Sequence, residues 1–483
     1  MYYQQGANAF VTKLNLLLIK PSVLLLLFSF LFCFWFQDLL RPYDSKTGGH
    51  NFVWDAAGYY SYLPAIFHHK GSFDDGGYSF FLPLNVQGHH YPKYTYGVAA
   101  MQLPFYALAG LFAYITNQPV DGYSPPFVEF IRWGTVFYVL LGLFFLRRFL
   151  LRYFSEVATS VALFSCLFGS MLYTYTFVQS ELSHGPLFFL FSLFIYLTDK
   201  WHRSPGHLLS ILLAVVLGLI SVVRFTEIYI VLVFLLWQVT SPRAAFTKLK
   251  LLLQRPGVFL WFPLIGVLFW VPQLLFWKHY LGSYVFDTYV NESFFWADPQ
   301  ILNVLFSYRK GLITYSPVFA IAFLGVFFIR REFPFSKLSL FFIIALTVYI
   351  FSCWWDWTYG GCFGNRAFCE EIALLAIPLA AISDFMFNLI PNTFLKKSGP
   401  VVFLVLIFVC AFQNIGQSYQ YQNQRIIHGW ATSKSVFWGS FRRYHYGADF
   451  INPYWTELRF RNQDAWLKGK EREDTVIYIE RGK

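Results

Sequence analysis

Apolar runs recur along the whole chain and are separated by short polar connections. Most of these runs are about 15–22 residues long, close to the roughly 20 residues that a helix needs to cross a bilayer. The pattern predicts an all-α polytopic membrane protein with about 11 transmembrane helices. The expected spans lie near residues 18–38, 131–151, 157–177, 185–198, 208–223, 226–240, 257–277, 317–330, 338–353, 371–389 and 400–416.

Composition agrees with the membrane class, and the charge pattern bears on partners. The chain is 57% hydrophobic and only 13% charged, whereas a soluble domain carries about 25% charged residues. Its net charge of +11 is spread over short connections. Because nucleic-acid binding needs a clustered basic surface, we expect no nucleic-acid partner. Attraction to membrane lipid headgroups and positive-inside topology account for the excess charge.

One further apolar run, residues 97–117, decides the topology. If this run does not span the bilayer, the N-terminus is cytoplasmic and all five cytoplasmic connections are basic, as the positive-inside rule requires. If it spans, every later loop is inverted and the rule fails. Because the run contains Pro104 and two glycines, we predict an interrupted helix that is re-entrant or interfacial.

This topology divides the chain into two regions. Residues 1–416 form the membrane domain, with a long first outer loop over 38–130, and residues 417–483 lie outside the cytoplasm. The end of the second region (TVIYIERGK) alternates apolar and polar residues as a strand does. We expect a small extracytoplasmic cap with a few strands, with a frayed terminus as the alternative for the last ten residues.

The most polar interruption is residues 50–97, which carry Asp55, Lys93 and many tyrosines. A long aromatic loop of this kind is more often functional than disordered. Asp55 precedes a short amphipathic helix, where it could cap the helix or act as a catalytic base. Lys93 could extend to the membrane interface or face an anionic ligand. Asp74 and Asp75 (FDDGGY) predict a turn.

Two further candidate groups adjoin predicted spans. Glu181 and His184, with Gln179, occupy a short outer loop and either line a sugar pocket or only make the loop polar. Arg224 lies between two apolar runs, where an ionisable side chain is costly. It either pairs with Glu227 at i, i+3 to close the turn or recognises a phosphate.

Two later polar stretches contain the remaining candidates. Arg309 and Lys310 (SYRKGLITYSPVF) are basic on the outer side, against the charge trend, which suggests an anionic ligand. The stretch WWDWTYGGCFGNRAFCEE is rich in glycine, which tolerates positive φ, and its one basic residue is Arg366. The planar guanidinium suits bidentate phosphate contacts. A disulfide between Cys362 and Cys369 is left open by the sequence.

These stretches carry a family resemblance. An acid just outside the first span, followed by Tyr59 and Tyr60, resembles the first outer loop of the GT-C superfamily of membrane glycosyltransferases. Relatives include the protein O-mannosyltransferases and the aminoarabinose transferases of lipid A. The stretches GLITYSP and WWDWTYGGCFGNRAFCEE also look similar to those of bacterial GT-C-like proteins. Asp55 matches the superfamily acid, but Ala56 stands where a second acid is usual, which puts a metal-bridging pair in doubt.

The resemblance implies transfer of a sugar from a polyprenyl-phosphate carrier, by inverting displacement, with Asp55 as base. The acceptor could be a protein, a lipid or a polysaccharide. The site would face the periplasm from a bacterial inner membrane, without a nucleotide; a divalent metal and the oligomeric state stay open. The expected substrate- and phosphate-binding residues are Lys93, Tyr59, Tyr60, His184, Glu181, Arg224, Arg309 and Arg366.

Two other functions remain as alternatives. A transporter or flippase for lipid-linked sugars would also need cations facing a lipid phosphate, but it would not need Asp55. A structural subunit without catalysis would keep the helical bundle but no continuous cavity between Asp55 and Arg366.

Overall fold

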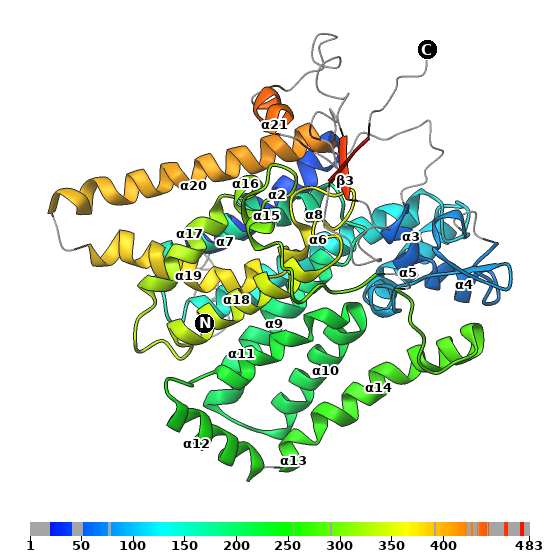
Figure 1. Cartoon of the computed structure of the whole chain (residues 1–483), viewed down its shortest axis with the longest axis horizontal. Coiled ribbons are helices and arrows are strands. Elements are labelled where there is room, and N and C mark those ends of the chain that lie inside the picture. The colour runs from blue at the N-terminus through cyan, green and yellow to red at the C-terminus, as the bar shows by residue number, and fades with distance from the viewer. Residues whose placement is uncertain are drawn as a thin grey trace, which may run out of the picture.

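The structure is a computed structural model, and helices make up most of the chain that it describes (Figure 1). The described residues are 20–40, 52–75, 79–254, 256–289, 292–390, 393–422, 427, 432, 434–441, 443, 458–461 and 474–477. The first part of the predicted outer loop, over 41–51, and most of the region after 422 lie outside these residues.

The α-helices are α2 (Pro21–Leu40), α3 (Asp55–Tyr60), α4 (Tyr62–Phe67), α5 (Gly97–Ile115), α6 (Pro125–Leu150), α7 (Glu156–Phe168), α8 (Leu172–Phe177), α9 (His184–Arg203), α10 (His207–Val223), α11 (Val231–Leu236), α12 (Pro242–Leu253), α13 (Pro256–Phe259), α14 (Trp261–Phe276), α15 (Ile301–Phe306), α16 (Leu312–Tyr315), α17 (Val318–Gly325), α18 (Lys337–Cys353), α19 (Ile372–Asp384), α20 (Thr393–Gln422) and α21 (Lys434–Ser440). Short 3-10 or π turns are η2 (Ser79–Phe81), η3 (Phe225–Ile230), η4 (Trp277–Leu281), η5 (Val326–Phe328), η6 (Arg366–Phe368) and η7 (Phe385–Leu389). The strands are β1 (Leu84–Val86), β2 (His89–Tyr91), β3 (Leu458–Arg461) and β4 (Asp474–Ile477).

Within the described ranges, five helices are long and apolar enough to cross a membrane: α5, α6, α14 with η4, α19 with η7, and Ser398–Gln422 of α20. Shorter apolar helices lie at six other positions, namely Pro21–Phe32, Glu156–Phe168, His207–Val223, Phe225–Leu236, Val318–Phe328 and Lys337–Cys353. This is the architecture of an all-α membrane protein, as the hydrophobic pattern predicts. The number of spans stays a prediction.

Exposed apolar side chains mark the periphery of the bundle. Leu264 and Leu268 of α14, and Val402 and Phe412 of α20, are each more than 60% exposed. Lipid tails are as apolar as these side chains, so such a surface suits a bilayer. By contrast, every residue of α19 from Ile372 to Asp384 is buried, and this helix packs against α7 and α17.

A second set of helices surrounds the N-terminal polar segment. α6 packs against α5 and α9, and α10 packs against α9 and α14. The short helices α3 and α4 lie beside α5 at one end of the molecule (right in Figure 1).

At the other end of α9, the buried Asp199 is held by Arg152, by Arg203 and by the hydroxyl of Tyr153. Both ends of α9 therefore carry buried polar contacts.

The predicted turn at Asp74 supports a β-hairpin. β1 and β2 pair antiparallel, with Val86 opposite His89 across a two-residue turn. Both turn residues, Gln87 and Gly88, have positive φ, as a tight hairpin turn requires. The Asp74 carboxylate receives a hydrogen bond from the backbone N–H of His90 at 3.0 Å and also contacts the His89 ring. Asp74 therefore fixes this hairpin.

Two other expectations are tested by the fold. The run 97–117 is not interrupted: α5 is one continuous helix with Pro104 inside it, and its length and composition would allow it to span. Proline is tolerated here because neighbouring protein and local adjustment can satisfy the freed backbone groups. In the C-terminal region, β3 and β4 pair antiparallel, so the predicted strand near the end of the chain is present.

Gly97 allows α5 to begin against the end of α10. A Cβ at this position would lie 2.2 Å from the carbonyl oxygen of Val222 and 2.4 Å from the backbone nitrogen of Val223. These are backbone atoms, which cannot rotate away. The backbone N–H of Tyr96 also donates to the Gln273 side chain of α14 at 3.0 Å. The segment before α5 is therefore fixed to both α10 and α14.

We expect Gly97→Ala to lower the thermal unfolding midpoint of the detergent-solubilised protein, because the methyl group must separate two backbones. A cost of about 1–3 kcal/mol is typical of overpacking. Gly266→Ala in α14 is the matched control, since a Cβ there meets nothing within 4 Å. Equal midpoints for the two variants would contradict the close contact.

Candidate functional site

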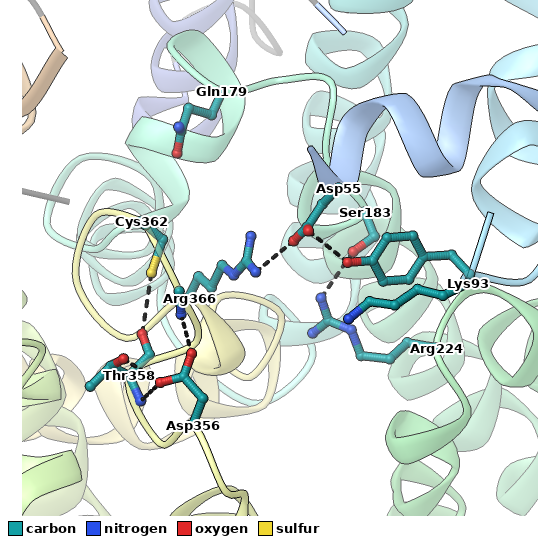
Figure 2. Close-up of polar contacts among 12 residues, drawn as sticks. Asp55, Lys93, Gln179, Ser183, Arg224, Asp356, Thr358, Cys362 and Arg366 are labelled. Atoms are coloured by element: carbon teal, nitrogen blue, oxygen red, sulfur yellow. Dashed lines mark hydrogen bonds and ion pairs between the residues drawn. The ribbon is translucent and has the colours of Figure 1, made fainter. Parts of the chain in front are cut away.

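A cavity of about 630 Å³ lies between the N-terminal polar segment, the junction of α10 and η3, α14 with η4, the segment before α15 and the loop after α18. Five predicted site residues line it: Asp55, Tyr59, Lys93, Arg224 and Arg366. Figure 2 shows that Asp55, Arg224 and Arg366 extend towards a common region, whereas Gln179 lies apart from them. The other lining residues include Tyr94, Phe225, Glu227, Trp270, Trp277, Asp287, Tyr289, Glu292, Phe294, Trp354, Trp355, Asp356 and Tyr359.

Asp55 is the first residue of α3, but it does not cap this helix. No side-chain hydrogen bond caps the helix, and the Asp55 carboxylate makes two other contacts. Oδ1 accepts a hydrogen bond from the Tyr94 hydroxyl at 2.6 Å, and Oδ2 pairs with the Arg366 guanidinium at 2.6 Å. The capping explanation of this acid therefore does not hold, and both of its oxygens are directed at residues of the cavity wall.

These contacts set the charge of the two groups. Burial alone would raise the pKa of the Asp55 carboxyl, but Arg366 and the hydrogen bond from Tyr94 outweigh burial and hold this pKa below its usual value. Burial and the nearby carboxylate together raise the pKa of the Tyr94 hydroxyl well above its usual value. At neutral pH, Asp55 is therefore an ionised acceptor and Tyr94 a neutral donor.

Arg366 is positioned by the loop between α18 and α19. Asp356 organises this loop by accepting hydrogen bonds from the backbone N–H of Thr358 at 3.1 Å and of Gly360 at 2.7 Å. Gly360 and Gly364 have φ of 75° and 58°, values that glycine adopts without strain. The glycines of this stretch thus allow the chain to fold back and bring Arg366 to Asp55.

Arg224 links the cavity to a buried carboxylate layer. Its Nη1 pairs with Glu370 at 2.7 Å and with Glu227 at 3.5 Å, and its Nη2 donates to Ser183 Oγ at 3.0 Å. The turn-closing pair with Glu227 therefore exists, but the contact with Glu370 is much shorter. Arg224 bridges the junction of α10 and η3 to the start of α19 and still reaches the cavity.

Lys93 has specific partners in the cavity wall. Its Nζ pairs with Glu292 at 2.8 Å and lies 4.9 Å from the centre of the Tyr289 ring. Trp355 donates from Nε1 to the other Glu292 oxygen at 3.3 Å. Lys93 thus joins the N-terminal segment to the segment before α15. It does not simply extend to the membrane interface, which was the other possibility given by the sequence.

The remaining predicted residues divide between the cavity and other places. Tyr59 lines the cavity, but Tyr60 stacks on Phe52 with ring centres 3.7 Å apart and donates to the carbonyl of Gly122. Successive helical residues point in different directions, so Tyr59 and Tyr60 cannot both face the cavity. Tyr60 belongs to the packing between α3 and α5.

Three further candidates do not line the cavity. Glu181 pairs with Arg132 Nε at 2.9 Å, and Arg309 is absent from the lining. His184 is buried and contacts Glu370 at 2.9 Å, so it lies behind Arg224. His184 therefore touches a residue that supports the site, while Glu181 serves contact between α6 and the turn before α9.

Lys310 departs from expectation, and the structure also answers the open question of a disulfide. Lys310 is buried, and its Nζ donates to the carbonyl oxygen of Cys362. Burial lowers the pKa of the Lys310 ammonium. It therefore anchors the loop that carries Arg366, and its charge does not mark an exposed anion site. Cys362 and Cys369 are both free thiols, so no disulfide joins them.

The described residues do not fit a metal site beside Asp55. The contacts of its carboxylate are Tyr94 and Arg366, and neither supplies a second carboxylate. Elsewhere, His184, Cys369 and Glu370 place ligand atoms within 4.8 Å of one another. Glu370 is already bound to Arg224 there, and a guanidinium next to the ligands opposes a second cation.

Sequence reasoning missed Tyr94, Asp356, Glu292 and Glu370 as parts of the site. Glu292 had the clearest signal, because it lies in a long polar and aromatic stretch, 282–300, between two apolar runs. The same criterion singled out residues 50–97. Tyr94 and Glu370 are adjacent to candidate groups, but nothing in the sequence distinguishes them from their neighbours.

No family model and no curated protein matches the chain.

A double-mutant cycle tests the Asp55–Arg366 pair. Arg366→Met should lower the free energy of unfolding by about 2–4 kcal/mol, because it leaves a largely buried carboxylate without its cation. Adding Asp55→Asn should recover part of this loss, with a coupling of about 1–3 kcal/mol. Denaturant unfolding in detergent at neutral pH measures both values.

The stabilisation by the Asp55–Arg366 pair depends on pH. Because the folded pKa of Asp55 lies below the ordinary value of 3.8, the stabilisation by the pair is present above that value and is lost as the pH falls through the folded pKa. Additive effects of the two substitutions at neutral pH would contradict the coupling.

Proposed function

We propose that the protein is a membrane glycosyltransferase that transfers a sugar from a polyprenyl-phosphate donor to an acceptor outside the cytoplasm. The observation that carries the proposal is the meeting of the ionised Asp55 carboxylate with three cations in a cavity that also has aromatic walls. The resemblance to GT-C enzymes, given above, supplies the reaction class. The acceptor is a protein, a lipid or a polysaccharide.

In the proposed topology the chain crosses a bacterial inner membrane 11 times, with the N-terminus in the cytoplasm. The first outer loop, 38–130, and the region 417–483 then lie in the periplasm, and α5 belongs to the outer loop. The cavity would open on the periplasmic side, since it is lined by Asp55 and Lys93 from that loop.

The cations would hold the donor phosphate. Arg366, Arg224 and Lys93 each have N–H donors beyond those that bind their carboxylate partners. Phosphate oxygens can therefore add to these groups without displacing every partner. As the bond to the sugar breaks, negative charge grows on the phosphate, and cations already in place stabilise that charge.

Asp55 would orient and deprotonate the acceptor. The acceptor hydroxyl oxygen attacks the anomeric carbon from the face opposite the phosphate, and the bond from that carbon to the phosphate oxygen breaks. The hydroxyl proton passes to Asp55, and polyprenyl phosphate leaves with the bonding electron pair. The short contacts with Tyr94 and Arg366 would fix the carboxylate in one orientation before the acceptor arrives.

The aromatic wall suits the lipid part of the donor. Trp270 and Trp277 come from α14 and η4, and Phe225, at the start of η3, is 61% exposed. α14 also presents apolar side chains on its outer surface. A prenyl chain could thus continue from the cavity to the bilayer along this wall, while the sugar stays with the polar residues.

Asp55→Asn tests the proposal against transport. It should reduce consumption of the lipid donor by about 10²–10⁴-fold, the range for loss of a general base. Lipids that copurify with the wild type and with the variant are first identified by mass spectrometry, and the donor found is then used for turnover. The variant should retain intact donor.

Asp74→Asn is the matched control, because Asp74 lies in the same polar segment but binds the hairpin. It should turn over donor like the wild type. If Asp55→Asn consumes donor at the wild-type rate, or if no polyprenyl-phosphate lipid accompanies the wild type, the proposed function is wrong.

A further inference from the structure

Every cation in the cavity wall is already paired with a carboxylate. The pairs are Arg366 with Asp55 at 2.6 Å, Arg224 with Glu370 at 2.7 Å, and Lys93 with Glu292 at 2.8 Å. A site built only to attract phosphate would leave such groups without acidic partners. The pairing therefore limits how much negative charge the cavity accepts.

The numbers of acidic and basic side chains that line the cavity also indicate that it disfavours a highly charged anion. Its acidic members are Asp55, Glu227, Asp287, Glu292 and Asp356, and its basic members are Lys93, Arg224 and Arg366. Even without Glu227, which is fully buried, the acids outnumber the cations around the cavity by four to three. An anionic ligand meets both attraction from the nearest cations and repulsion from the excess acids, and the repulsion grows with the charge of the ligand.

Donor and product differ in this charge if the proposed function is correct. The phosphate of a lipid-linked sugar is a diester, which can lose only one proton. The sugar-free lipid is a monoester with a charge of about −1.5 to −2 at neutral pH. Excess carboxylate in the wall therefore disfavours the product more than the donor.

Glu292 is the acid best placed to act on the phosphate alone. It contacts Lys93 and Trp355, and 18% of its side chain is exposed, whereas Glu370 is fully buried behind Arg224. Asp55 is assigned to the acceptor, and Asp356 is engaged by backbone N–H groups. Glu292 thus shares the one lysine of the lining with any phosphate that enters.

We propose that Glu292 is a specificity-determining residue, which makes the cavity prefer a phosphodiester lipid to the phosphomonoester product and so promotes product release. It acts by holding a negative charge beside Lys93. This inference rests on the proposed function for the identity of the lipid, but it depends on charge and on no particular sugar.

The test uses two probes with the same prenyl chain, a polyprenyl monophosphate and its methyl ester. The methyl ester is a diester and carries no sugar, so the comparison isolates phosphate charge. Dissociation constants are measured by titration calorimetry on the full-length protein in detergent. Glu292→Gln should tighten monophosphate binding by about tenfold relative to the methyl ester, because one nearby negative charge is removed.

Two further variants control the comparison. Glu292→Asp keeps the charge and should keep the wild-type ratio of the two constants. Glu129→Gln removes a carboxylate that pairs with Arg132 away from the cavity, and it should change neither constant. Asp287→Asn, another acid of the lining, should shift the ratio in the same direction as Glu292→Gln if the latter does not fold.

The outcomes separate the two proposals. If the wild type binds both probes and Glu292→Gln leaves the ratio unchanged, or weakens both equally, Glu292 only fixes the loop and the inference is wrong. If the wild type binds neither probe, the proposed function itself fails.

Discussion

The contact between Asp55 and Arg366 is the constraint on which the rest of the site depends. An unpaired charge with little exposure to water is costly, so this ion pair favours contact between the N-terminal polar segment and the loop before α19. Three other features of the structure hold these two side chains in contact. The α3 helix starts at Asp55, Tyr94 binds the free carboxylate oxygen, and Asp356 shapes the loop that presents Arg366.

The cost of burying a charge without a partner also explains why the polar groups occur in layers. Next to the cavity, cations and carboxylates alternate, and behind them Glu370 binds both Arg224 and His184. Lys93, Arg224 and Arg366 each have a carboxylate beside them, so a polar centre persists within a largely apolar bundle. An anion that enters this centre would meet cations that already have acidic partners.

Much of this was predictable from the hydrophobic pattern, because apolar length and charge asymmetry determine membrane helices locally. The pattern anticipated helices in the apolar runs. Sequence reasoning also singled out Asp55, which lines the cavity, and the glycines that let Arg366 approach it. The sequence-based predictions failed for contacts between residues that are distant in the sequence. The pairing of Lys93 with Glu292 and the inward burial of Lys310 depend on how loops fold together. Tyr60 was misassigned because two adjacent tyrosines look equivalent until the helix sets their directions.

The backbone contact at Gly97 has a mechanical consequence. It joins the segment that carries Lys93 and Tyr94 to the end of α10, which carries Arg224, and Tyr96 extends the joint to α14. Three sides of the cavity are therefore joined to one another by a close backbone contact and a hydrogen bond. Any widening that admits a large ligand has to come from the remaining sides, which are the segment before α15 and the loop after α18. Because those sides carry Glu292 and Arg366, their displacement would separate the ion pairs with Lys93 and Asp55.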